Sequence, residues 1–121
     1  MAALVLWIAT AIGGITMGAI WLSHDGPAAH RDGNSRISPG RLGAHAGLAA
    51  SGLLLWGLSV AVDNVAPGWL ALLLLAGAAA LGFLMFMTWL AGRGAARAGD
   101  LPEHHISSKI VVLHGALAVL R

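Results

Sequence analysis

Two histidines lie in strongly apolar stretches of this sequence, where a titratable side chain is unexpected. His45 belongs to "LGAHAGLAAS", residues 42–51, and His114 belongs to "VVLHGALAV", residues 111–119. An ionisable residue inside a membrane segment is costly to bury and usually has a function. Two imidazoles could hold the iron of a b-type haem as axial ligands, with the macrocycle between helices. The first hypothesis is therefore haem b bound by His45 and His114.

Small residues surround both histidines and could make room for a flat cofactor. Gly43 and Gly47 bracket His45 as Gly-x-x-x-Gly, and Gly52, seven residues on, lies close to the His45 face of a helix. Gly115 follows His114. The haem hypothesis therefore predicts a cofactor site made of His45, His114, Gly47, Gly52 and Gly115. The same small residues are typical of transmembrane helices that pack closely, and each histidine could simply hydrogen-bond across helices. Both interpretations remain open from the sequence.

Other metal or catalytic chemistry has less support. Zinc or copper would need a third or fourth protein ligand, and no carboxylate or cysteine lies at the depth of the two histidines. Four further histidines occur in polar segments, where metal ligation and a solvated loop are both open: His24, His30, His104 and His105. The chain has no HExxH motif and no glycine-rich phosphate loop. We predict no catalytic residue, and the pattern favours a protein that is not an enzyme on its own.

The composition is that of a membrane protein. The 121 residues are 58% hydrophobic and 10% charged, whereas soluble domains are about 25% charged. Residues 1–23, 42–62 and 64–92 contain no Asp, Glu, Lys or Arg, and each run has the ~20 residues needed to cross ~30 Å of hydrocarbon. A fourth run, residues 110–120, has only eleven residues. At ~1.5 Å per residue it would cover about 16 Å.

These runs predict an all-α, polytopic transmembrane bundle with three full helices and a short or truncated fourth. We favour truncation, because a helix end within hydrocarbon leaves carbonyls without partners. The expected helices of a single membrane-embedded domain, residues 1–121, are 1–23, 39–62, 67–92 and 101–121.

Loop residues set these expected boundaries. Pro39 after Ser38 favours a helix start, and Asp63-Asn64 favours a tight turn. Asp100, with Glu103 three residues later, predicts a partial capping box that starts the last helix near residue 101. The first run has no basic segment before its apolar stretch, so we interpret it as a retained helix rather than a cleaved signal peptide.

The basic residues predict an orientation. Three lie between the first and second uncharged runs and three between the third and fourth, namely Arg31, Arg36, Arg41, Arg93, Arg97 and Lys109. The positive-inside rule then places these two loops in the cytoplasm and the N-terminus outside, in a bacterial inner membrane. At ~1.5 Å per residue, His45 and His114 would lie about 6 and about 7.5 Å from the same cytoplasmic edge. Matched depths would allow both to face one haem.

Two segments carry a resemblance to known proteins. "RLGAHAGLAASGLLLWGL" and "LPEHHISSKIVVLHGALAVL", with the turn into the third helix, resemble small four-helix integral membrane proteins of high-GC bacteria. The resemblance implies a fourth helix that continues well beyond "HGALAV", and it implies no established activity.

Three functions fit these observations. The first is a small haem-binding subunit that transfers electrons to or from a quinone or a partner protein. The second is a non-catalytic scaffold or accessory subunit of a larger membrane complex, and the third is a small solute or metal permeation protein. The net charge of +2 is scattered and forms no basic patch for nucleic acid. The lipid bilayer is the partner that all three functions share.

Overall fold

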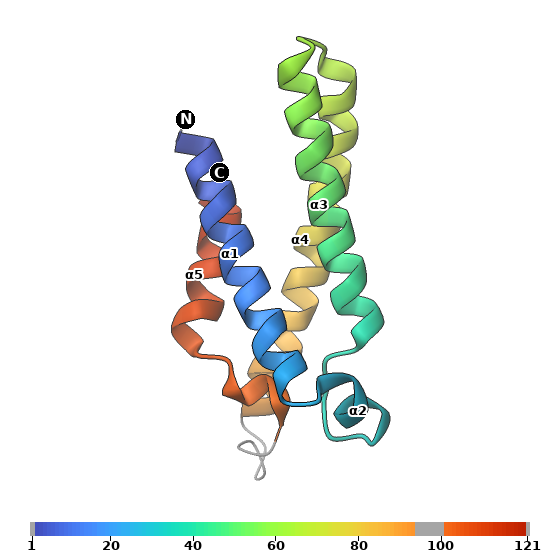
Figure 1. Ribbon diagram of the computed structural model, residues 1–121, viewed down its shortest axis with the longest axis vertical. Helices are drawn as coiled ribbons and strands as arrows, with labels where there is room; N and C mark the ends of the chain where they lie inside the picture. Colours follow the sequence, from blue (N-terminus) through green and yellow to red (C-terminus); the bar gives the residue numbers. More distant parts are fainter. Residues whose placement is uncertain (1, 94–100, 121) are drawn as a thin grey trace. The chain divides into compact units, whose positions relative to one another are not determined.

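The computed structural model describes residues 2–93 and 101–120, and this part of the chain is helical with no strand (Figure 1). Its elements are α1 (Ala2–Ser23), α2 (Gly26–Arg31), α3 (Pro39–Ala61), α4 (Val65–Arg93), the 3-10 turn η2 (Pro102–His105) and α5 (Ser108–Leu120). The expected fold class is confirmed for the described residues: they are all-α, with three long apolar helices, α1, α3 and α4, and the shorter apolar helix α5.

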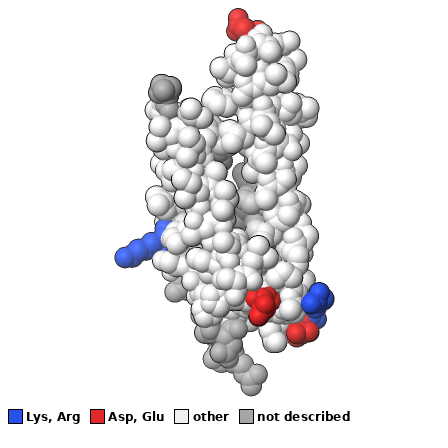
Figure 2. Space-filling view, in the orientation of Figure 1, with Lys and Arg blue, Asp and Glu red and all other residues white. Residues whose placement is uncertain are grey.

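The three long helices have the length and the surface of membrane spans. Their most apolar windows have mean hydropathies of 2.0 in α1, 1.4 in α3 and 2.5 in α4. Large apolar side chains on them are exposed, for example Leu54 at 75% and Leu73 at 69%. Figure 2 shows Lys, Arg, Asp and Glu only as a few separate groups of atoms on the face in view. A surface this apolar belongs in lipid, so these are the helices of a membrane protein.

The described residues fall into two compact units. Unit 1 consists of residues 1–39 together with 86–121, and unit 2 consists of residues 40–85. In unit 1, α5 packs along α1, and η2 contacts α1 and α2 (Figure 1). Unit 2 contains α3 and the first part of α4, which run back along each other from a tight turn (Figure 1).

The turn between α3 and α4 lies where the sequence predicts it. Asp63 has a positive φ of 49°, a conformation that Asp and Asn tolerate better than most residues. The Asn64 side chain then accepts a hydrogen bond from the backbone N–H of Ala66 at 2.9 Å. This is N-cap geometry, and it starts α4 at Val65, two residues before the predicted start at Pro67.

The last helix begins later than the sequence predicts. α5 starts at Ser108, not near residue 101, and η2 precedes it. Ser107 has the capping role, because its Oγ accepts a hydrogen bond from the Lys109 N–H at 3.3 Å. The predicted capping box is wrong because the Glu103 carboxylate bonds to a distant loop instead, at Ser35 and Arg36. Asp100, the other member of that box, lies outside the described residues.

Gly52 allows α3 and α4 to approach closely. A Cβ at Gly52 would lie 2.7 Å from Cγ of Leu75 and 3.3 Å from the carbonyl oxygen of Ala71. Close backbone approach at small residues is how many membrane helices associate. We therefore expect Gly52→Leu to destabilise this helix pair by about 2 kcal/mol through overpacking.

Unfolding of the purified protein in mild detergent by added SDS, followed by tryptophan fluorescence, measures this loss. Gly57→Leu is the matched control, because no described atom lies within 4 Å of the Cβ position of this α3 residue. Equal SDS midpoints for the two variants would contradict the prediction.

Candidate intramembrane histidine site

His45, on α3, is hydrogen-bonded to the backbone of α4. Its Nδ1 lies 2.7 Å from the carbonyl oxygen of Ala78. A carbonyl can only accept, so Nδ1 carries the proton and donates. In the neutral ring the lone pair then belongs to Nε2. The half-buried imidazole lies against Gly82, whose ideal Cβ would be 3.0 Å from the ring Cε1.

His114, on α5, makes the same kind of contact with α1. Its Nδ1 donates to the carbonyl oxygen of Thr10 at 2.8 Å, so its lone pair also belongs to Nε2 in the neutral form. The ring lies against Gly14, whose ideal Cβ would be 3.0 Å from Cε1, and a Cβ at Gly13 would be 3.4 Å from Cβ of His114.

Both histidines therefore bind the same local pattern of a neighbouring helix, a backbone carbonyl followed four residues later by a glycine. The accepting carbonyl lies four residues before the glycine, at Thr10 before Gly14 and at Ala78 before Gly82. In an α-helix this carbonyl also accepts the N–H of that glycine. The missing side chain lets the imidazole reach the carbonyl and lie on the helix surface. Sequence reasoning missed these acceptor residues, because neither a backbone carbonyl nor its glycine is distinctive by type.

The predicted small residues of the site differ in their surroundings. Gly47 and Gly115 are exposed, and no described atom lies within 4 Å of either ideal Cβ. Gly52 is buried against α4. His45, Gly47 and Gly52 belong to unit 2, whereas His114 and Gly115 belong to unit 1. Their predicted role in binding a cofactor remains a prediction.

The loop histidines have separate surroundings. The rings of His24 and His105 stack with centroids 3.8 Å apart and planes 11° apart. Nδ1 of His30 lies 3.1 Å from the carbonyl oxygen of Ser35, and Nε2 of His104 lies 3.0 Å from the ideal Cβ of Gly92. Among the described residues, no three His, Cys, Asp or Glu side chains are grouped so that they could hold a metal ion.

A buried polar cluster in unit 1 was also missed by sequence reasoning. Trp21 donates its Nε1–H to Ser35 Oγ at 3.1 Å, and this hydroxyl donates to Glu103 Oε2 at 2.7 Å. Glu103 Oε1 accepts the backbone N–H of Arg36 at 2.8 Å, and its carbonyl accepts Nε1–H of Trp89 at 3.1 Å. Glu103 is 1% exposed. This cluster joins the loop between α2 and α3 to η2.

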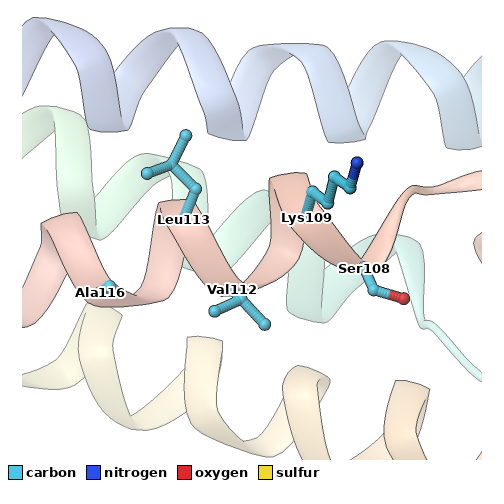
Figure 3. Close-up of a pocket in the computed structure, with 5 residues that line it drawn as sticks. All are labelled: Ser108, Lys109, Val112, Leu113 and Ala116. Atoms are coloured by element: carbon cyan, nitrogen blue, oxygen red, sulfur yellow. The ribbon is translucent and has the colours of Figure 1, made fainter.

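A pocket of about 500 Å³ lies along one face of α5 (Figure 3). Five residues line it: Ser108, Lys109, Val112, Leu113 and Ala116. Val112 and Leu113 are neighbours, so their side chains diverge by about 100° around the helix, and Figure 3 shows Lys109 one turn before Leu113. An apolar face with a cation at one end suits lipid, whose acyl chains meet the aliphatic residues and whose headgroups meet the lysine.

No protein-family model, curated protein or solved structure matches this chain.

Proposed function

We propose that this membrane protein is a small b-type haem-binding subunit for electron transfer, with His45 and His114 as the axial ligands. One observation carries the proposal: each of the two histidines donates its Nδ1–H to a backbone carbonyl. Histidines that bind a metal usually donate their second ring N–H in this way, which fixes the tautomer and the orientation of the ring. Nε2 is then the ligating atom in both residues.

The donor set supports haem over a bare metal ion. A zinc or copper site needs three or four protein ligands, and the described residues offer no such group. Haem iron needs only one or two protein ligands, and the imidazole of histidine is a common one. When bound, a bis-histidine haem iron exchanges one electron between its ferric and ferrous states.

The residues of the chain would hold the two rings and keep water away. The carbonyls of Ala78 and Thr10 fix the imidazole planes, and an apolar environment around a haem contributes to its reduction potential. Under the positive-inside rule, the basic residues support a position of both histidines toward the cytoplasmic leaflet of an inner membrane. The electron partner in this proposal is a quinone or a second protein.

Visible spectra test the proposal. We expect the protein, expressed with ample haem and purified in mild detergent, to show a Soret band that sharpens after dithionite reduction. His45→Ala and His114→Ala are each expected to abolish the six-coordinate low-spin spectrum, because each removes one axial ligand. His24→Ala and His105→Ala are the matched controls and should keep it. A colourless wild type, or a spectrum unchanged in both His45→Ala and His114→Ala, would refute haem ligation.

The second candidate is a non-catalytic accessory subunit, and the same two hydrogen bonds favour it. Each one already joins two helices, and an interhelical bond of this kind in a membrane stabilises packing by about 1 kcal/mol. A colourless protein that copurifies with a larger membrane complex would support this candidate.

A further inference from the structure

The two histidine contacts occur at corresponding places of a repeated pattern in the chain. "GITMGAIWL", residues 14–22, and "GFLMFMTWL", residues 82–90, share Gly, Met, Trp and Leu in the same spacing. An offset of 68 positions thus relates Gly14 to Gly82 and Trp21 to Trp89. The acceptor residues Thr10 and Ala78 have the same offset.

The pattern continues through the loops into the histidine helices. "HAGLA", residues 45–49, corresponds to "HGALA", residues 114–118, with an offset of 69 positions. Ile37 and Ile106, which precede these two segments, have this offset as well, and both are buried, at 8% and 7% exposure.

The structure repeats contacts as well as residue types. Trp21 and Trp89 are both buried, and each donates its indole N–H to the residue fourteen positions later. The acceptor is the side-chain hydroxyl of Ser35 in the first case and the backbone carbonyl of Glu103 in the second. The histidine contacts agree even in detail. The distance from the ideal glycine Cβ to the ring Cε1 is 3.0 Å at both sites. The distances to Nδ1 and Nε2 are 3.6 and 3.8 Å at Gly14 and 3.4 and 3.9 Å at Gly82.

We infer that the chain contains two copies of one helix–loop–helix unit, residues 10–49 and 78–118, and that the copies exchange their histidine contacts. Residues 94–100 of the second copy lie outside the described part. His45 of the first copy binds α4 of the second, and His114 of the second copy binds α1 of the first. Gly14 and Gly82 are then equivalent positioning residues, each for the histidine of the other copy.

The role of Gly14 and Gly82 in positioning haem ligands rests on the proposed haem function. The contact of each histidine with the other copy does not. Two ligands held by equivalent surroundings suit a cofactor with two equivalent axial positions, such as a bis-imidazole haem. A Cβ at either glycine would press on Cε1, since 3.0 Å is tighter than ordinary van der Waals contact. Alanine at either position should therefore rotate one specific ring and leave the other unchanged.

Nitrogen-15 NMR of the histidine side chains tests whether each histidine contacts the other copy, and this test does not depend on bound haem. The sample is the 121-residue chain in detergent, reduced with dithionite so that any bound haem is diamagnetic. The resonances are assigned with His45→Ala and His114→Ala. We expect Gly14→Ala to shift or broaden the Nδ1–H signal of His114 and Gly82→Ala to do so for His45.

Two alanine controls set the scale of the test. Gly18 has no described atom within 4 Å of its ideal Cβ, and a Cβ at Gly77 would meet Leu48 rather than a histidine. Changes no larger than those in Gly18→Ala and Gly77→Ala would overturn the inference. A change at His45 in Gly14→Ala and at His114 in Gly82→Ala would overturn it as well.

A disulfide provides a second measurement if a glycine variant folds poorly. The chain has no cysteine, and the 3.4 Å between the ideal Cβ of Gly13 and the Cβ of His114 is close to the ~3.5–4.5 Å of natural disulfides. Gly13→Cys with His114→Cys should therefore form an intramolecular disulfide under mild oxidation. If this disulfide does not form in the folded protein, the inferred contact of the second copy's His114 with α1 of the first copy is wrong.

The haem-dependent part has its own readout. In haem-loaded protein, Gly14→Ala and Gly82→Ala should shift the low-spin EPR g values, because these depend on the angle between the imidazole planes. Unchanged g values with altered NMR signals would overturn the role of Gly14 and Gly82 in positioning haem ligands. The contacts between the copies would stand. A colourless protein with the expected NMR changes would refute the proposed function and retain the exchange between copies.

Discussion

Glu103→Ala is expected to reduce the free energy of unfolding by roughly 3–5 kcal/mol. The carboxylate is 1% exposed and accepts two hydrogen bonds, from Ser35 Oγ and from the backbone N–H of Arg36. Hydrogen bonds to a charged group contribute about 1.5–3 kcal/mol each, and loss of the acceptor leaves buried donors without a partner. Alanine would also leave a cavity beside Trp21 and Trp89, which bond to the same cluster.

Graded substitutions separate the hydrogen bonds from the volume of the side chain. Glu103→Gln keeps the shape and one acceptor oxygen, but it turns an NH2 group toward a donor. We expect roughly half the loss seen in Glu103→Ala. Asp32→Ala removes an exposed acidic side chain in the same unit and should change stability by less than about 0.5 kcal/mol.

SDS titration of the detergent-solubilised protein provides the stabilities, with tryptophan fluorescence as the probe because two of the five tryptophans belong to the cluster. If Glu103→Ala unfolds at the wild-type midpoint, the cluster contributes nothing to stability.

Gly26→Ala is the second substitution with a large expected effect. Gly26 is the first residue of α2 and is buried against the indole of Trp21. A Cβ at this position would overlap Cδ2 and Cε2 of that ring. An indole cannot bend, so α2 or the whole ring must shift. A shift of the ring weakens the bond from its Nε1 to Ser35. We expect a loss of about 3 kcal/mol, from overpacking and the weakened hydrogen bond together.

Gly18→Ala is the control for this prediction. It adds the same methyl group to α1, where no described atom lies within 4 Å of the Cβ position. Its midpoint in the same SDS titration should equal or slightly exceed that of the wild type, since alanine is the better helix former by about 1 kcal/mol. The prediction for Gly26 fails if both variants unfold at the same SDS concentration.

The repeat was readable in the sequence, but the identities that carry it are sparse. Gly14, Met17, Trp21 and Leu22 recur 68 positions later among residues that differ, and glycine, methionine and leucine are common in membrane helices. The structure identifies the repeat because corresponding residues make the same contacts. The same ring packs against Gly14 and Gly82 with distances that agree within 0.2 Å, and this is stronger evidence of equivalence than four shared residue types.

The sequence by itself determined the helices and their apolar character. In a membrane each backbone group must be bonded within its own segment, so helix formation follows from the local run of apolar residues. The starts of α3 at Pro39 and of α4 near the Asp63-Asn64 turn also follow from local rules. His45 and His114 could be singled out for the same reason, as titratable residues within apolar runs.

Only the tertiary structure decided which groups these residues contact. Glu103 could have capped a helix locally, but Ser35 and Arg36, 68 and 67 positions away, offered donors in a buried site. His45 and His114 donate hydrogen bonds to carbonyls 33 and 104 positions away. A helical carbonyl becomes available to a side chain only where the packing of two helices and a glycine expose it. Local composition cannot specify that geometry, because it depends on residues that meet only after the helices pack.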